Sequence, residues 1–116
     1  MARILGVDYG DTRIGLAISD PMKSIAFPYK TVDNKSLEYL IDFFKKLILD
    51  KEIDCLVIGL PIGLDGKDTE QTKKVRIFAD SLKVLNVSIY FQDERLTSVS
   101  AKKSLIEHNL LLKSLV

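Results

Sequence analysis

Three acidic residues stand where apolar segments of the chain end, and their chemistry suits a metal site. Asp8 follows the apolar run Ile4–Val7, while Asp93 and Glu94 follow the alternating segment Val87–Gln92. Carboxylates that gather without His or Cys suit hard cations such as Mg²⁺ or Mn²⁺, which also bind water and substrate phosphate. We therefore expect Mg²⁺ or Mn²⁺ and phosphate chemistry where these acids meet. For any single acid at a strand end, the alternative is that it is solvated or caps the next helix.

Basic residues close to these acids could bind the phosphates of a nucleic acid. Arg13 lies across a tight turn from the first acid and Arg95 directly follows the second group, so each could donate a bidentate hydrogen bond to phosphate. Lys73 and Lys74 help to make one side of a predicted helix basic. The alternative is that the arginines form local ion pairs and the lysines a solvated face. A net charge of +1 provides no overall field for a polyanion, so binding would depend on such local patches.

Apolar patterns predict the elements that must position these residues. Continuous or alternating apolar runs predict strands, and apolar residues repeated at i, i+3 and i+4 predict helices. The predicted strands are 3–7, 13–19, 26–32, 54–60 and 87–92; the predicted helices are about 36–50, one that includes 75–85, and one capped by Thr97.

The connections between these elements predict a mixed sheet. Short turns favour antiparallel pairing of the first three strands, whereas crossover helices favour parallel pairing of the first, fourth and fifth. Pro28 favours an edge position for the third strand. We predict an α/β fold with a five-stranded sheet in the order 3-2-1-4-5, flanked by helices. The carboxyl ends of its parallel strands share one edge, which brings Asp8 toward Asp93 and Glu94. Asp20 ends a strand of the opposite direction and is predicted to form a turn.

Length and composition exclude several classes of protein. The chain has 116 residues, 47% of them apolar, which fits one domain over residues 1–116 and leaves no room for two lobes that close around a nucleotide. It contains no Walker A, G-x-G-x-x-G or G-x-S-x-G motif. It also has no signal-peptide pattern and no apolar run near the ~20 residues that span a bilayer. With Cys55 as its one cysteine, we expect a cytoplasmic protein without membrane contact.

Three short motifs, in this order and spacing, resemble a known family. They are Gly6–Gly10 with Arg13–Ala17 and Ser19–Asp20, then Gly59–Pro61 with Gly66, and finally Asp93–Thr97 followed by Ala101. Together they resemble the YqgF (RuvX) family, whose members are described as Holliday junction resolvases and as nucleases that process the 5′ end of pre-16S rRNA. The resemblance covers nearly the whole chain and implies an RNase H-like fold.

The resemblance also implies roles for the acidic residues. Asp8 would bridge two divalent ions and Glu94 would complete part of their coordination. Asp93 is the second choice, because neighbouring residues on a strand point to opposite faces. Such a metal pair activates the attacking water and stabilises the leaving 3′ oxygen. Family members continue into a last helix that starts with a third acid, and we expect this chain to lack that C-terminal helix.

The resemblance predicts a metal-dependent nuclease of structured nucleic acid, with precursor rRNA as its substrate and ribosomal particles as possible partners. A DNA junction resolvase is the alternative enzyme, since both reactions use the same chemistry and differ in surface contacts. A non-catalytic nucleic-acid-binding module of the same fold is the alternative outside enzymes. The phosphate loop of an actin-like ATPase is disfavoured, because that site needs a second lobe.

Overall fold

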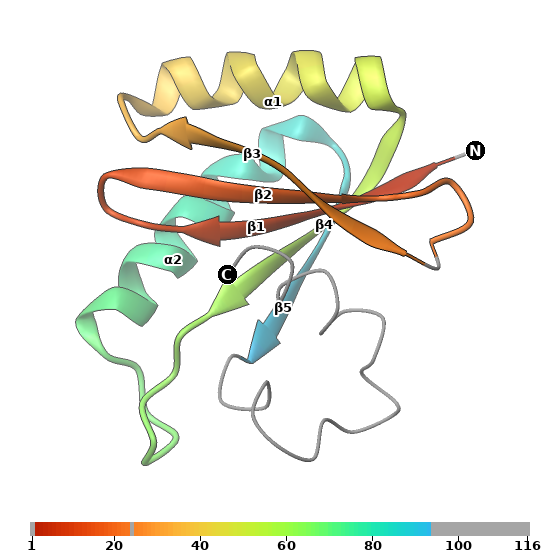
Figure 1. Ribbon diagram of the computed structural model, residues 1–116. Helices are drawn as coiled ribbons and strands as arrows, with labels where there is room; N and C mark the ends of the chain where they lie inside the picture. Colours follow the sequence, from red (N-terminus) through yellow and green to blue (C-terminus); the bar gives the residue numbers. More distant parts are fainter. Residues whose placement is uncertain (1, 24, 94–116) are drawn as a thin grey trace.

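A mixed five-stranded sheet forms the centre of the protein (Figure 1). The computed structural model describes residues 2–23 and 25–93. The strands are β1 (Arg3–Tyr9), β2 (Arg13–Ser19), β3 (Ala26–Asp33), β4 (Ile53–Leu60) and β5 (Ser88–Asp93), and the helices are α1 (Leu37–Lys51), α2 (Glu70–Ser81) and the short 3₁₀ helix η1 (Leu82–Leu85). The order β3-β2-β1-β4-β5 confirms the prediction. As expected, β1 pairs antiparallel with β2 and parallel with β4.

Strand β3 lies at one edge of the sheet, as Pro28 predicted. It pairs antiparallel with β2, and Pro28 lies opposite Ala17 where the register shifts between Leu16 and Ala17. A proline has no backbone N–H to donate, so it is tolerated where a strand has one neighbour or where pairing is irregular.

Both long helices pack on the same face of the sheet. Leu5 and Val7 of β1 and Ile58 of β4 share one buried cluster with Phe44 of α1 and Phe78 of α2. The Phe44 and Phe78 rings have centroids 6.3 Å apart, which joins the helices across this face. The opposite face has a smaller cluster of Ile4, Ala17 and Val57. Alternate residues of a strand face opposite sides of the sheet. Two residues of one strand therefore lie on the same face when they are an even number of positions apart, and we then say that they have the same parity.

The two helices begin at side-chain caps. Ser36 accepts a hydrogen bond from the backbone N–H of Tyr39, so α1 begins one residue later than the predicted segment. Thr69 and Thr72 form a reciprocal capping box at the start of α2. These bonds satisfy N–H groups that have no partner within the first helical turn.

The predicted second helix is continuous through Leu85, but the structure divides it at Ser81. The following 3₁₀ helix η1 buries Leu82 and Leu85. A 3₁₀ helix has three residues per turn, so these two residues, three apart, lie on the same side and stay in the core. The left-handed conformation of Asn86 then ends the turn.

The alternating segment that predicted strand β5 does not show how deeply each of its residues is buried. The polar Gln92 is only 3% exposed, whereas the apolar Phe91 is 42% exposed. Alternation predicted the two sides of this strand but not how well each is covered, because coverage depends on elements that are distant in sequence. The predicted helix after Thr97 lies outside the described residues. Within the part of the chain that the structure describes, no helix is long and apolar enough to cross a membrane.

Candidate active site

Asp8 lies near the carboxyl end of β1, on the face of the sheet opposite the helices. It shares its parity with Ile4, which belongs to the smaller cluster on that face, whereas Val7 and Tyr9 pack toward Phe44 and Phe78. The Asp8 side chain is half-buried. The sheet therefore presents one carboxylate on its helix-free side, just before β1 ends.

Glycines flank Asp8 on both neighbouring strands. Gly15 of β2 is its register partner. On β4, Ile58 pairs with Val7, so one further step of the parallel register places Gly59 beside Asp8. Adjacent strands are about 4.8 Å apart, and side chains of such neighbours would stand against the carboxylate. With glycine at both positions, the carboxylate of Asp8 has no side chain from either adjacent strand beside it.

Burial raises the pKa of the Asp8 carboxyl above its ordinary value of 3.8. Removal from water disfavours the ionised form, and no nearby cation offsets that effect among residues 2–23 and 25–93. The described residues also provide no hydrogen-bond donor to this carboxylate. An anion that is partly desolvated and lacks a compensating partner is a position at which a bound cation would be stabilising.

Gln92 continues the same row across the sheet. It pairs with Gly59, and its buried side chain lies on the same face as Asp8. This row of Gly15, Asp8, Gly59 and Gln92 was not predicted as a unit. Gly15 and Gly59 lie within the short motifs of the sequence, but only strand register shows that they border the same carboxylate.

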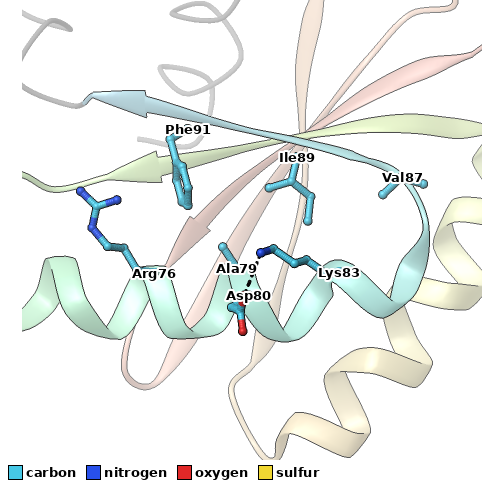
Figure 2. A pocket seen from close by; sticks show the side chains of 7 residues that line it. All are labelled: Arg76, Ala79, Asp80, Lys83, Val87, Ile89 and Phe91. Carbon is cyan, nitrogen blue, oxygen red and sulfur yellow. Dashed lines mark ion pairs between the residues drawn. The ribbon is translucent and has the colours of Figure 1, made fainter.

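Asp93 lies on the opposite face from Asp8. It has the parity of Ile89 and Phe91, whose side chains point toward α2 and line a hollow of about 370 Å³ (Figure 2). The structure therefore brings Asp93 to the predicted edge of the sheet, because it pairs with Leu60 at the end of β4, but not to the face of Asp8. Strand pairing therefore gives Asp8 and Asp93 different faces of the sheet at the same edge.

Two further predicted site residues, the acidic Glu94 and the neighbouring Arg95, lie outside the described residues. Among the residues that are described, no three or more His, Cys, Asp or Glu side chains gather in a way that could hold a metal ion. Asp8 is thus the one predicted metal ligand whose position on the helix-free face is established.

Arg13 lies on the same face as Asp8. It precedes Gly15 by two residues on β2, so its side chain has the same parity, and it is exposed. Gly10 makes the intervening turn possible, because a Cβ at that position would lie 2.5 Å from the carbonyl oxygen of Arg13. The tight turn therefore holds Arg13, the predicted phosphate-binding arginine, on the face of Asp8 and two residues nearer the turn than Gly15, the partner of Asp8.

The two predicted substrate-binding lysines of α2 differ in their surroundings. Lys73 pairs with Glu70 at 3.7 Å within the helix. Lys74 instead reaches Asp11 in the β1–β2 turn at 3.4 Å, which places its ammonium group at the carboxyl end of β1. Both ion pairs are exposed and contribute little to stability, so either lysine can leave its acidic partner at little cost.

Arg76 of α2 and Lys83 of η1 also have acidic partners, at shorter distances. Arg76 donates to both carboxylate oxygens of Asp68 at 2.8 and 3.1 Å, and these hydrogen bonds lower the pKa of Asp68. Lys83 pairs with Asp80 at 2.9 Å (Figure 2). The basic side predicted for this helix is therefore largely neutralised by neighbouring acids, and Lys74 is its member nearest the end of β1.

Asp20 has the structural role that its position predicted. Its Oδ1 accepts a hydrogen bond from the backbone N–H of Ile25 at 2.9 Å, and its carbonyl accepts from Lys23 at 2.9 Å. It closes the β2–β3 turn at the end of the sheet away from Asp8.

Comparisons with known proteins identify the family of the chain. The model of the RuvX family, described as Holliday junction resolvase, matches residues 2–114. The chain belongs to the RuvX family. Among its relatives are proteins named "Putative pre-16S rRNA nuclease" from Maridesulfovibrio salexigens, 40% identical over 93% of this chain and 81% of the relative, and from Clostridium botulinum, 42% identical over 93% of this chain and 80% of the relative. The expected RuvX resemblance is confirmed, as is membership of a nuclease family.

Solved structures support the RNase H-like fold. The chain is similar to Thermus thermophilus RuvC in complex with a Holliday junction substrate, with a TM-score of 0.61 and 12% identity over 97% of this chain and 80% of that one. It is also similar to the large terminase nuclease of the thermophilic phage G20c, with a TM-score of 0.56 and 16% identity over 97% of this chain and 54% of that one. At such identities the likeness concerns the fold of this RuvX-family chain and not its substrate.

Proposed function

We propose that this protein is a divalent-metal-dependent endonuclease that acts on structured RNA and processes the 5′ end of pre-16S rRNA. The observation that carries the proposal is the placement of Asp8, half-buried on the helix-free face between Gly15 and Gly59. The choice of RNA follows the names of curated relatives that are about 40% identical over most of their length.

The donor chemistry of the site suits Mg²⁺ or Mn²⁺. Asp8 offers hard carboxylate oxygens, and its raised pKa reflects desolvation that a bound cation would offset. Asp8 would share the ions with Glu94, which lies outside the described residues, whereas Asp93 is the weaker choice because it lies on the opposite face. Bound ions of this kind lower the pKa of an attacking water and stabilise the leaving 3′ oxygen.

Basic side chains would position the substrate around this carboxylate. Arg13, exposed on the face of Asp8, would bind a phosphate adjacent to the one that is cut. Lys74 would attract the strand around the end of β1, and we assign a weaker role of the same kind to Lys73. Arg95, directly after Glu94 in the sequence, is proposed as a further phosphate contact.

Cleavage assays on two substrates test this function. A fragment that spans the 5′ end of pre-16S rRNA and a four-way DNA junction are each incubated with protein and Mg²⁺ or Mn²⁺. We expect cleavage of the RNA by the natural protein, at least a hundredfold loss in Asp8→Asn, and no loss in Asp42→Asn, whose residue is exposed on α1. Full activity of Asp8→Asn would refute the role of Asp8.

The second candidate function is a Holliday junction resolvase, which is favoured by the description of the matching family. Cleavage of the DNA junction and not of the RNA would establish it in place of the first. A non-catalytic nucleic-acid-binding module is the third, and it would be favoured if titration with Mn²⁺ revealed no binding that depends on Asp8. For the nuclease that we propose, precursor ribosomal particles in the cytoplasm are the expected setting.

A further inference from the structure

A hollow of about 300 Å³ opens beside Tyr9, on the helix side of the sheet. We call it the Tyr9 hollow. Residues of three elements and of the β3–α1 connection contribute to it, among them Tyr9, Lys35, Leu37, Lys74, Ile77 and Phe78. Its volume is at the lower end of the range for sites that bind small molecules or parts of larger ligands.

The Tyr9 hollow is next to the proposed catalytic carboxylate. Tyr9 directly follows Asp8, and consecutive Cα atoms are about 3.8 Å apart. The two side chains point to opposite faces, so Asp8 borders the helix-free side and Tyr9 borders the hollow. A nucleic-acid strand that passes over the end of β1 would therefore contact both side chains. The hollow would then bind a nucleotide close to the phosphate that is cut.

The walls of the hollow are apolar and open to water. Ile77 is 69% exposed and Leu37 is 49% exposed, although both are large aliphatic residues on helix surfaces. Tyr9 packs against Phe78 with ring centroids 4.6 Å apart, which gives the hollow an aromatic side. Exposed apolar residues that line a concave site next to a candidate active site mark a place where a flat apolar group would be shielded from water.

The charged groups at the hollow favour an anionic ligand. Lys35 and Lys74 both line it. Lys74 contacts Asp11 at 3.4 Å in an exposed pair that can exchange for a phosphate at little cost. Lys35 lies 5.1 Å above the ring of Tyr39, where it remains accessible. Apolar walls with two cations at the rim match a nucleotide, in which a flat base is joined to a phosphate.

Two hydrogen bonds of Asn34 also hold the hollow in place. The Asn34 side-chain amide donates to the carbonyl of Gly10 at 2.9 Å, and the Asn34 backbone N–H donates to the carbonyl of Thr12 at 2.9 Å. These bonds tie the β3–α1 connection to the β1–β2 turn. A site that is fixed before binding loses less entropy when a ligand enters.

We propose that the Tyr9 hollow binds one unpaired base of the RNA substrate, within a few nucleotides of the phosphate that Asp8 helps to cut. The base lies against Leu37, Ile77 and the Tyr9 ring, and Lys35 and Lys74 contact its flanking phosphates. This inference rests on the proposed function, because it assumes that the strand passes the end of β1. It makes recognition depend on an unpaired nucleotide at a fixed distance from the cleavage site.

Abasic scanning tests the proposal. A fluorescently labelled oligoribonucleotide from the 5′ region of pre-16S rRNA is prepared with one abasic residue at each position in turn, and binding to Asp8→Asn protein is measured by anisotropy. We expect one position to weaken binding about tenfold, the scale of losing one bound base. Adding Ile77→Gln should weaken binding of the intact RNA by a similar factor and remove the effect of that abasic position. Leu49→Gln, a change at a leucine of α1 that is also largely exposed, should alter neither.

The outcomes separate this proposal from the nuclease function. If no abasic position matters, or if its effect persists in Ile77→Gln, the base does not bind in the Tyr9 hollow. The same holds if Ile77→Gln leaves RNA affinity unchanged, for example because the hollow holds a peptide. Cleavage by the natural protein is measured in parallel. Cleavage without an abasic effect overturns only the hollow, whereas an abasic effect without cleavage overturns only the nuclease.

Discussion

Asp8→Asn is expected to stabilise the metal-free protein, even though it removes the proposed catalytic carboxylate. The Asp8 carboxylate is partly desolvated, and the described residues offer it neither a cation nor a hydrogen-bond donor. A buried group without a partner costs about 1–3 kcal/mol and more when it is charged, so for this half-buried side chain we take the extra cost of the charge as about 1 kcal/mol. The unfolding entropy of globular proteins, about 2.1 cal/mol/K per residue, converts that free energy into a rise in Tm of about 4 °C for a chain of this length. Asparagine keeps the shape and carries no charge, so it avoids the extra cost of desolvating a charge.

The pH dependence of this gain follows from the raised pKa of Asp8. Between the ordinary pKa of 3.8, which holds in the unfolded chain, and the higher folded pKa, the folded natural protein binds more protons than the unfolded one. Its stability therefore falls as pH rises through that interval, and the Asn variant lacks this loss. The difference in Tm between the two proteins should reach its full value at pH 7. It should disappear near pH 3, where Asp8 is protonated in both the folded and the unfolded state.

Divalent metal should reverse the order of stability. Thermal unfolding is followed by circular dichroism in EDTA and again with Mn²⁺ in excess. At a hundred times its Kd, a ligand of the folded state alone stabilises by about 2.7 kcal/mol, which exceeds the gain from Asn. We expect the natural protein to become the more stable one in Mn²⁺, while Asp42→Asn follows the natural protein throughout. Equal Tm values in EDTA would refute the desolvation argument, and equal Mn²⁺ shifts in natural and Asp8→Asn protein would refute metal binding at Asp8.

Three further changes test the space beside Asp8, the core and a helix cap. Gly15→Val places a branched side chain beside Asp8, and valine suits a strand, so cleavage of the RNA fragment should fall at least tenfold while the far-ultraviolet circular dichroism spectrum stays unchanged. Full activity would show that the open space beside Asp8 is not needed for cleavage. Phe44→Ala empties a fully buried site between the helices and should lower the free energy of unfolding by about 3–5 kcal/mol in urea titrations, and a loss below 1 kcal/mol would contradict its central place in the core. Thr69→Ala removes the cap of α2 and should cost about 1 kcal/mol by the same measurement; no change would mean that the capping box is not formed in solution.

Local patterns were sufficient to predict most of the fold. Pro28 and the short turns predicted the edge strand and the antiparallel half of the sheet, and crossover helices predicted the parallel half. The prediction failed where burial depends on distant neighbours. Gln92 alternates as an exposed residue would, yet it is buried, and the helix through Leu85 tightens into a 3₁₀ turn after Ser81.

The candidate site was predictable in its chemistry but not in its geometry. Residue type and order alone showed that Asp8 follows an apolar run, that acids recur more than eighty residues later, and that three motifs match one family. Which side chains share a face became clear only from the three-dimensional arrangement of the strands. Strand register places Gly15 and Gly59 beside Asp8 and pairs Asp93 with Leu60 on the face that carries the helices. The packing of α2 on that face sets Lys74 and Ile77 beside Tyr9. A shift of one residue in any pairing would exchange the faces, and register is fixed by the packing of the whole sheet rather than by any one segment.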